Sequence, residues 1–159
     1  MCSETGGIRR FYDVPMEGPR ASGRCLCGAV TYEVRGPLRD VVLCHCIECQ
    51  RWSGTGAGAF AASSLEHLEI AQDTPIRWVD SPESDHGARR ALCAECGSSL
   101  FWEAANAERI GIAAGTLDPP TGLRVTAHIY THQTPDWDEL PHDGLPRDPE
   151  RGTIEPRWT

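Results

Sequence analysis

The sequence has 159 residues, with 15 basic and 23 acidic side chains and a formal net charge of −8. All of the basic residues are arginine, and eight residues are cysteine. The acidic balance argues against nucleic acid or an anionic membrane as a partner, because phosphate binding relies on clustered cations. A chain of this length can bury a hydrophobic core without disulfides, so the cysteines need another explanation.

The sequence carries no sign of a membrane span or a secretory signal. It has no apolar run of about 18 residues, and its N-terminus, MCSETGGIRR, has no charged segment followed by an apolar one. We therefore expect a soluble protein of the cytoplasm, a reducing compartment in which thiols stay free or bind metal.

Composition divides the chain into one domain and two tails. Residues 1–22 show no sustained hydrophobic periodicity, and residues 147–159 are rich in charge and proline. Proline interrupts helices and central strands, so both ends are expected to be peripheral. The domain is predicted to span residues 23–146.

The pattern of the domain is typical of a mainly β fold. Val30, Tyr32 and Val34 alternate with polar residues, as in a strand with one buried face. Further short apolar runs bounded by turn residues predict strands at 40–43, 58–62, 68–70, 76–79, 89–92, 98–102, 109–113 and 125–131. One short helix is expected at 48–52, ended by Gly54.

Seven of the eight cysteines form three clusters, and Cys2 stands apart as a thiol in the N-terminal tail. The first and third clusters supply four sulfurs, from Cys25, Cys27, Cys93 and Cys96. Residues i and i+2 of an extended segment face the same side, and C-x-x-C followed by glycine is a tight turn in which two thiolates converge. Four such sulfurs suit a closed, structural zinc site. Disulfides fit the spacing poorly, because adjacent C-x-C thiols bond with strain.

The middle cluster offers three thiolates, from Cys44, Cys46 and Cys49, within six residues. His45 lies between two of them and is expected to point away from the metal. Three protein ligands with an open fourth position are typical of catalytic zinc. A second closed site completed by a distant residue such as His128, or a cluster of reduced thiols, is the alternative.

Five segments together resemble a known family. They are GRCLCGAVTYEVRGP at 23–37, CHCIECQRWSGTGAGAF at 44–60, CAECGSSLFW at 93–102, GTLD at 115–118, and HIYT at 128–131 followed by Trp137 and the GLP of 144–146. This ordered set resembles the glutathione-dependent formaldehyde-activating enzyme family, which includes centromere protein V. The resemblance implies a β-tent fold of two small antiparallel sheets organised by zinc, with few short helices. It also implies a structural zinc on the four-cysteine set, a catalytic zinc on the three-cysteine set, and carbon–sulfur lyase activity.

The activity implied is reversible adduct formation between a thiol such as glutathione and a small aldehyde such as formaldehyde, giving S-hydroxymethylglutathione. Glu48 and His45 are the candidates for proton transfer, because they are nearest the middle cluster in sequence. Arg51 is the candidate contact for a glutathione carboxylate, and Trp52 for a pocket wall.

Two other functions are weighed against this enzyme. A non-catalytic zinc-binding adaptor would use the same metals only to hold its shape. A zinc-bearing methionine sulfoxide reductase has a similar tent-like architecture but needs a reactive cysteine late in the chain, and no cysteine follows Cys96. The thiol, the aldehyde and the oligomeric state stay open.

Overall fold

Two β-sheets and one short helix make up the structure, a computed structural model that describes residues 18–84, 87–151, 154 and 157–159. The smaller sheet is antiparallel and contains, in spatial order, β1 (Ala21–Arg24), β2 (Thr31–Val34) and β5 (Leu68–Ile70). The larger sheet contains, in order, β10 (Val125–Ile129), β3 (Arg39–Cys44), β4 (Gly58–Ser64), β9 (Arg109–Ala113), β8 (Ser99–Glu103), β7 (Arg89–Cys93) and β6 (Ile76–Asp80). The prediction of a mainly β fold is confirmed.

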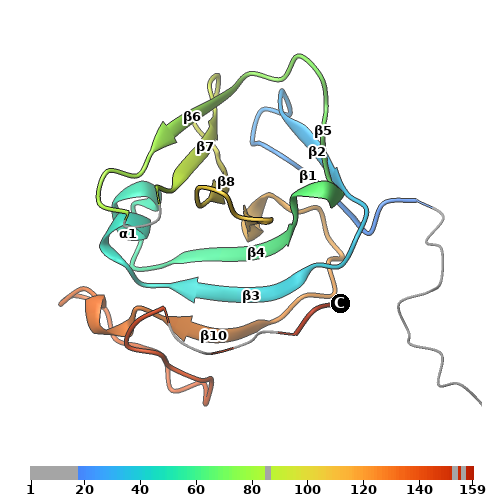
Figure 1. Cartoon of the computed structure of the whole chain (residues 1–159). Helices are drawn as coiled ribbons and strands as arrows, with labels where there is room; N and C mark the ends of the chain where they lie inside the picture. The colour runs from blue at the N-terminus through green and yellow to red at the C-terminus, as the bar shows by residue number, and fades with distance from the viewer. Residues whose placement is uncertain (1–17, 85–86, 152–153, 155–156) are drawn as a thin grey trace, which may run out of the picture.

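The sheets lean together like the sides of a tent (Figure 1). Strands β10, β3 and β4 form the floor, β6 and β7 rise on one side, and the small sheet rises on the other. Helix α1 (Ile47–Ser53) closes one end of the floor, directly after β3. Three 3-10 turns complete the elements: η1 (Leu65–His67), η2 (Ala114–Thr116) and η3 (Thr131–Gln133).

The larger sheet differs from the expected pair of small antiparallel sheets. It has seven strands, and β10 runs parallel to β3, with Ile129 opposite Cys44. A parallel pair requires a long connection between its strands, and here most of the chain lies between β3 and β10. Hydrophobic alternation reveals a strand but not the direction of its neighbour, which is why the sequence missed this pairing.

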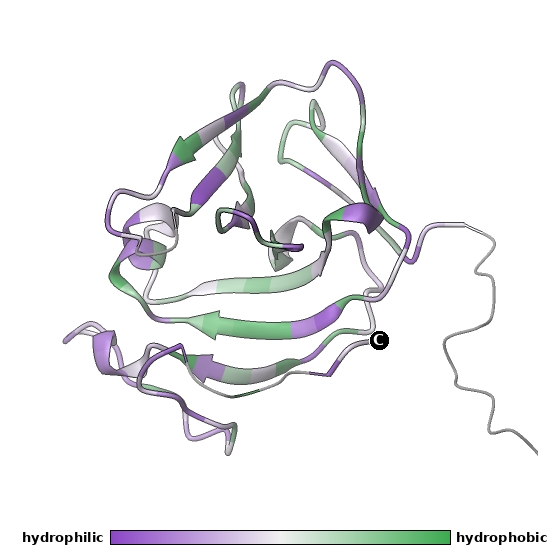
Figure 2. Ribbon diagram, in the orientation of Figure 1, coloured by the Kyte–Doolittle hydropathy of each residue, from purple (hydrophilic) through white to green (hydrophobic). Residues whose placement is uncertain are grey.

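The core lies between the two leaning sheets. The Tyr32 ring of the small sheet meets the Phe101 ring of the large sheet edge-on, with centroids 5.0 Å apart. Leu38, Ile110 and Ile112 are among the fully buried side chains around this contact. Figure 2 shows the apolar residues concentrated along the strands, while the connections are mostly polar. The same cluster includes Cys25 and Cys93, so the four-cysteine set is continuous with the core.

The described part of the predicted C-terminal tail lies against the larger sheet. Leu38 N donates to Thr159 O at 2.9 Å, and Thr159 N donates back to Leu38 O at 2.8 Å. The carboxylate of Asp40, which is 1% exposed, accepts a hydrogen bond from Arg157 Nε at 3.0 Å. These contacts attach the end of the chain to the start of β3.

The N-terminal boundary expected at residue 23 falls inside β1, a strand that the sequence analysis did not predict. Its residues, Ala-Ser-Gly-Arg, have no apolar alternation, and the strand forms because it pairs antiparallel with β2. Residues 1–17, including Cys2, lie outside the described part of the chain. Among the described residues, no helix is long and apolar enough to cross a membrane.

Substitution of Gly23 tests the packing of the small sheet. A Cβ at this position would lie 2.2 Å from Tyr32 Cζ and 2.7 Å from the carbonyl oxygen of Thr116. Gly23→Ala is therefore expected to reduce the free energy of unfolding of the zinc-loaded protein by about 1–3 kcal/mol, the usual cost of overpacking. Urea unfolding measures the change. Gly115→Ala is the control, because a Cβ there would meet nothing within 4 Å. Equal stability of the two variants would contradict this packing.

Candidate metal centres and active-site pocket

The four-cysteine cluster joins the two sheets. Cys25 and Cys27 lie in the turn between β1 and β2, and Cys93 and Cys96 at the turn between β7 and β8. The four Sγ atoms all lie within 4.8 Å of one another. Segments almost 70 residues apart in sequence thus present their sulfurs to a single point, as a shared metal ion requires.

The sulfur spacing of this cluster suits zinc. Cys25 Sγ lies 3.5 Å from Cys27 Sγ, which lies 3.8 Å from Cys93 Sγ. A tetrahedron with Zn–S bonds of about 2.3 Å places its sulfurs about 3.8 Å apart. Gly28 and Gly97 have φ angles of 80° and 76°, which glycine adopts without strain, and their turns bring the two sulfurs of each pair together.

Ser98 supports the same cluster, although the sequence analysis did not single it out. Its Oγ accepts a hydrogen bond from Leu26 N at 2.9 Å and lies 3.2 Å from Cys96 Sγ. Hydrogen bonds from the Ser98 side chain and backbone lower the pKa of Cys96 to about 5. Cys96 therefore favours the thiolate form, which is the form that binds metal.

The three-cysteine cluster forms where β3 meets α1. Cys44 ends β3, Cys46 caps the N-terminus of α1, and Cys49 is a buried residue of its first turn. Cys46 Sγ accepts the Cys49 backbone N–H at 3.4 Å, as an oxygen does in a conventional N-cap. Gly54 ends the helix in the left-handed conformation, as expected. The three Sγ atoms lie within 4.8 Å of one another.

Hydrogen bonds among these thiols distribute the protons unevenly. Hydrogen bonds with Cys44 and Cys49 lower the pKa of Cys46, whereas hydrogen bonds with Cys46 and Cys49 raise the pKa of Cys44. One sulfur is thus a ready thiolate, and metal binding would displace the protons of the others. All seven described cysteines are free.

Arg90 is a functional candidate that the sequence analysis missed. It is 4% exposed, and its guanidinium lies 3.7 Å from Cys49 Sγ and 3.6 Å from a Glu48 carboxylate oxygen. Its Nε donates to Ser81 Oγ at 2.9 Å. A buried cation beside the sulfurs offsets part of their negative charge. Arg90 lies on β7, far from the cluster in sequence, so no local motif could reveal it.

His45 is neither among the residues that line the cavity nor part of the three-cysteine group that could share an ion. Its Nε2 lies 2.9 Å from Nδ1 of His128, whose Nε2 lies 2.9 Å from Oδ2 of Asp143. Both ring nitrogens of His128 thus have partners, and His128 lies outside the group of sulfurs that could share an ion. This arrangement disfavours a closed second site completed by His128. The contact between His45, just before α1, and His128, on β10, instead links the start of the helix to that strand.

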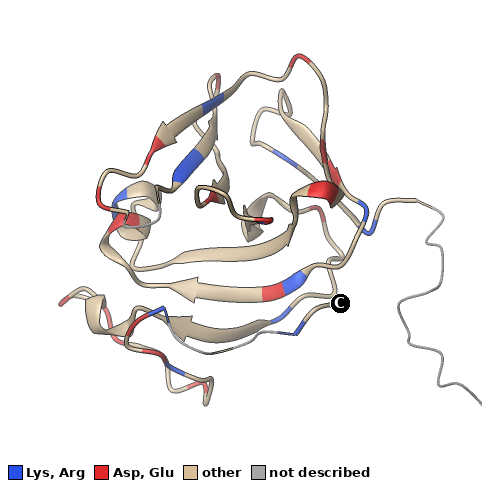
Figure 3. Cartoon of the chain, in the orientation of Figure 1, with Lys and Arg blue, Asp and Glu red and all other residues tan. Residues whose placement is uncertain are grey.

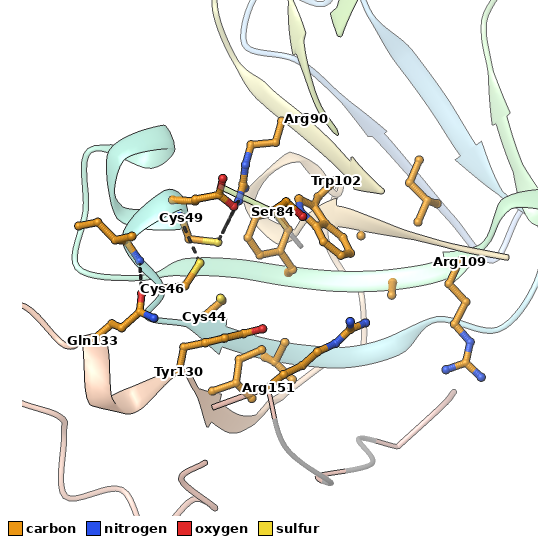
Figure 4. Close-up of a pocket in the computed structure, with 18 of the residues that line it drawn as sticks. Cys44, Cys46, Cys49, Ser84, Arg90, Trp102, Arg109, Tyr130, Gln133 and Arg151 are labelled. Atoms are coloured by element: carbon orange, nitrogen blue, oxygen red, sulfur yellow. Dashed lines mark hydrogen bonds and ion pairs between the residues drawn. The ribbon is translucent and has the colours of Figure 1, made fainter. Parts of the chain in front are cut away.

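A cavity of about 430 Å³ opens beside the three-cysteine cluster (Figure 4). Cys44, Cys46 and Cys49 line it, and none of the four other described cysteines does. Tyr130 and Trp102 line opposite walls, and the Tyr130 hydroxyl points into the space between them. Only one of the two described cysteine clusters is therefore accessible to a ligand in this cavity.

Only one of the four residues predicted for catalysis and substrate binding lines the cavity. Glu48 lines the cavity, whereas His45, Arg51 and Trp52 are not among its lining residues. Arg51 is exposed and lies 3.8 Å from Glu83. The ring of Trp52 lies under the Arg90 guanidinium, 5.9 Å from centroid to Cζ. Proximity in sequence was a poor guide here, because successive helical residues point in different directions.

Loss of single cysteines tests the division into two sites. Cys96→Ser is expected to unfold the protein, because two members of its cluster, Cys25 and Cys93, are part of the core. Cys46→Ser should remain folded and lose one of two zinc equivalents. Circular dichroism and metal analysis of the purified variants measure both effects. Equal unfolding by the two substitutions would contradict the division.

Comparisons with known proteins agree with the motifs. The sequence model described as "Glutathione-dependent formaldehyde-activating enzyme" matches residues 20–133. A crystal structure of a Rhodobacter sphaeroides protein superposes with a TM-score of 0.51 at 23% identity, covering 65% of this chain and 96% of the other, which supports the fold. A search of curated proteins gave no match. Since the family model matches well over half of the sequence, the chain belongs to the glutathione-dependent formaldehyde-activating enzyme family.

Proposed function

We propose that the protein is a zinc-dependent carbon–sulfur lyase that catalyses reversible adduct formation between a thiol such as glutathione and a small aldehyde such as formaldehyde. The observation that carries the proposal is the placement of the two clusters. Three cysteines line a cavity large enough for a small ligand, whereas four cysteines close on themselves between the sheets. Three protein ligands beside a cavity fit an open metal site, and four fit a structural one.

When bound to Cys44, Cys46 and Cys49, zinc would offer a fourth position to the sulfur of the substrate thiol and lower its pKa. The thiol sulfur then attacks the carbonyl carbon of the aldehyde and forms the C–S bond. The π electrons of the carbonyl move to its oxygen, which takes up one proton, while the thiol loses one. The lyase direction reverses each of these changes, so no oxidant or other reactant is required.

We assign these proton transfers to two residues that line the cavity. Burial raises the pKa of Tyr130, so its hydroxyl remains protonated at neutral pH and can donate to the developing alkoxide. Glu48 is held in place by Arg90 and by the Glu83 backbone N–H, which donates to Glu48 Oε1 at 3.3 Å. We assign Glu48 to proton acceptance. His45 acts through His128 as a positioning residue for the cluster, rather than as a proton donor.

Arg90 is assigned to orient this machinery. Its contacts with both Cys49 and Glu48 hold the sulfur cluster and the carboxylate in one arrangement.

The proposal also places the protein in the reducing cytoplasm, where the seven thiols are available for metal.

Glutathione is expected to raise the melting temperature of the zinc-loaded protein, because a ligand that binds only the folded state stabilises it by mass action. Differential scanning calorimetry at glutathione concentrations in the millimolar range measures the shift. Cys46→Ser should show none. An unchanged melting temperature of the native protein would favour another thiol or the non-catalytic adaptor.

Tyr130→Phe tests the assignment of the proton donor. Removal of the hydroxyl should slow adduct formation by about 10²-fold or more, the usual contribution of a positioned acid, and leave the glutathione-induced melting shift intact. Exchange NMR of thiol and formaldehyde with the adduct measures the rate. Tyr32→Phe is the matched control, because the Tyr32 hydroxyl bonds to Thr116 in the core at 2.6 Å. A full rate in Tyr130→Phe would refute the role of this hydroxyl.

A further inference from the structure

Three arginines that line the cavity have no carboxylate partner in the described part of the chain. Among the described residues, no Asp or Glu oxygen lies within 4 Å of the guanidinium of Arg39, Arg109 or Arg151. The fourth arginine of the cavity, Arg90, is paired with Glu48. In a protein with a net charge of −8, three unpaired cations in a single cavity are an unusual concentration.

Arg39 is the most constrained of the three. Its NH2 donates to the backbone oxygen of Phe60 at 2.9 Å, but its Nε is buried without a hydrogen-bond partner. Burial, together with repulsion from Arg109, lowers the pKa of Arg39 to about 10. A buried N–H donor without a partner is costly unless an anion or another acceptor satisfies it.

The strand register places this charge within reach of the three-cysteine cluster. Arg39 begins β3 and Cys44 ends it. The guanidinium of Arg39 nevertheless extends along the strand towards Cys44, because it donates to the backbone oxygen of Phe60, which lies opposite Val42. Val42 is two residues from Cys44, or about 7 Å along a strand. That span suits a peptide-sized thiol whose carboxylate is several bonds from its sulfur.

The other two arginines extend the positive wall. Arg109 on β9 stacks over the Trp158 ring, 4.9 Å from its centroid, which fixes the guanidinium near Arg39. The side chain of Arg151 reaches into the cavity beside Tyr130 (Figure 4). Figure 3 shows one basic and one acidic residue side by side near the start of β3; these are Arg39 and Asp40, at the opposite end of the strand from Cys44.

We propose that Arg39 and Arg151, supported by Arg109, form an anion subsite that binds the carboxylates of a thiol substrate whose sulfur lies at the three-cysteine cluster. This inference rests on the proposed function and names the residues that would bind the carboxylates of its thiol substrate. It replaces Arg51, which lies outside the cavity and beside Glu83, as the contact for a substrate carboxylate.

Isothermal titration calorimetry of the zinc-loaded protein tests the subsite with three related ligands. Glutathione has the thiol and both carboxylates, its diethyl ester has the thiol alone, and S-methylglutathione has the carboxylates alone. Glutathione should bind at least about tenfold more tightly than the diethyl ester, the difference expected from one charge-assisted hydrogen bond. Arg39→Gln and Arg151→Gln should each weaken glutathione binding by about tenfold and leave binding of the ester unchanged.

Arg77→Gln is the matched control, because it removes the same charge from an exposed position on β6, outside the cavity. It should bind all three ligands as the native protein does. If Arg39→Gln fails to fold, the glutathione affinity of Arg151→Gln, a substitution at an exposed residue, decides the test.

The outcomes separate this inference from the proposed function. Equal binding of glutathione and its ester, unaffected by either substitution, would overturn the anion subsite and leave thiol binding at the metal intact. Arginine-dependent binding of S-methylglutathione with the affinity of glutathione would support the subsite and contradict a role for the sulfur. Absence of binding by all three ligands would overturn both.

Discussion

The convergence of sulfur atoms from distant turns is the constraint on which the rest of the structure depends. The β1–β2 turn and the β7–β8 turn bring four cysteines within 4.8 Å, and each turn belongs to a different sheet. Four thiolates cannot stay this close without a cation, because their charges repel. A metal ion held by these four sulfurs would fix how the sheets lean, and the cavity on the floor of the tent depends on that geometry.

The three-cysteine cluster also brings sulfur atoms together, but beside a cavity rather than between two sheets. Its three sulfurs come from one strand end and one helical turn, so they depend on local structure rather than on the joining of two sheets. One side of the cluster faces the buried Arg90, and another faces the cavity. A cavity with sulfurs at one end and unpaired guanidinium groups towards the other can orient a molecule that carries a thiol and an anion. The negative charge of the whole protein makes such local cations important for attracting an anionic substrate.

The sequence predicted the strands and the cysteine clusters well, because both have strong local signals. Alternation of apolar residues located β2, and a glycine after C-x-x-C indicated a tight turn. Prediction from the sequence failed where distant segments pair: β1 has no apolar pattern, and nothing in the sequence around β10 indicates that it pairs in parallel with β3. The same limit applies to the site. Glu48 was found because it adjoins the cysteines. Arg90 on β7, Tyr130 directly after β10 and Arg39 at the far end of β3 also line the cavity, and only the fold could bring them together.

Cobalt substitution tests the central claim most directly, because cobalt(II) in thiolate sites has sulfur-to-metal charge-transfer absorption that responds to each added sulfur ligand. We expect glutathione to increase this absorption in the protein with cobalt in the three-cysteine site, as its sulfur takes the fourth position. S-methylglutathione, which has no thiol, should leave the spectrum unchanged. A spectrum that does not respond to glutathione at any concentration up to the millimolar range would contradict an open, thiol-binding metal site.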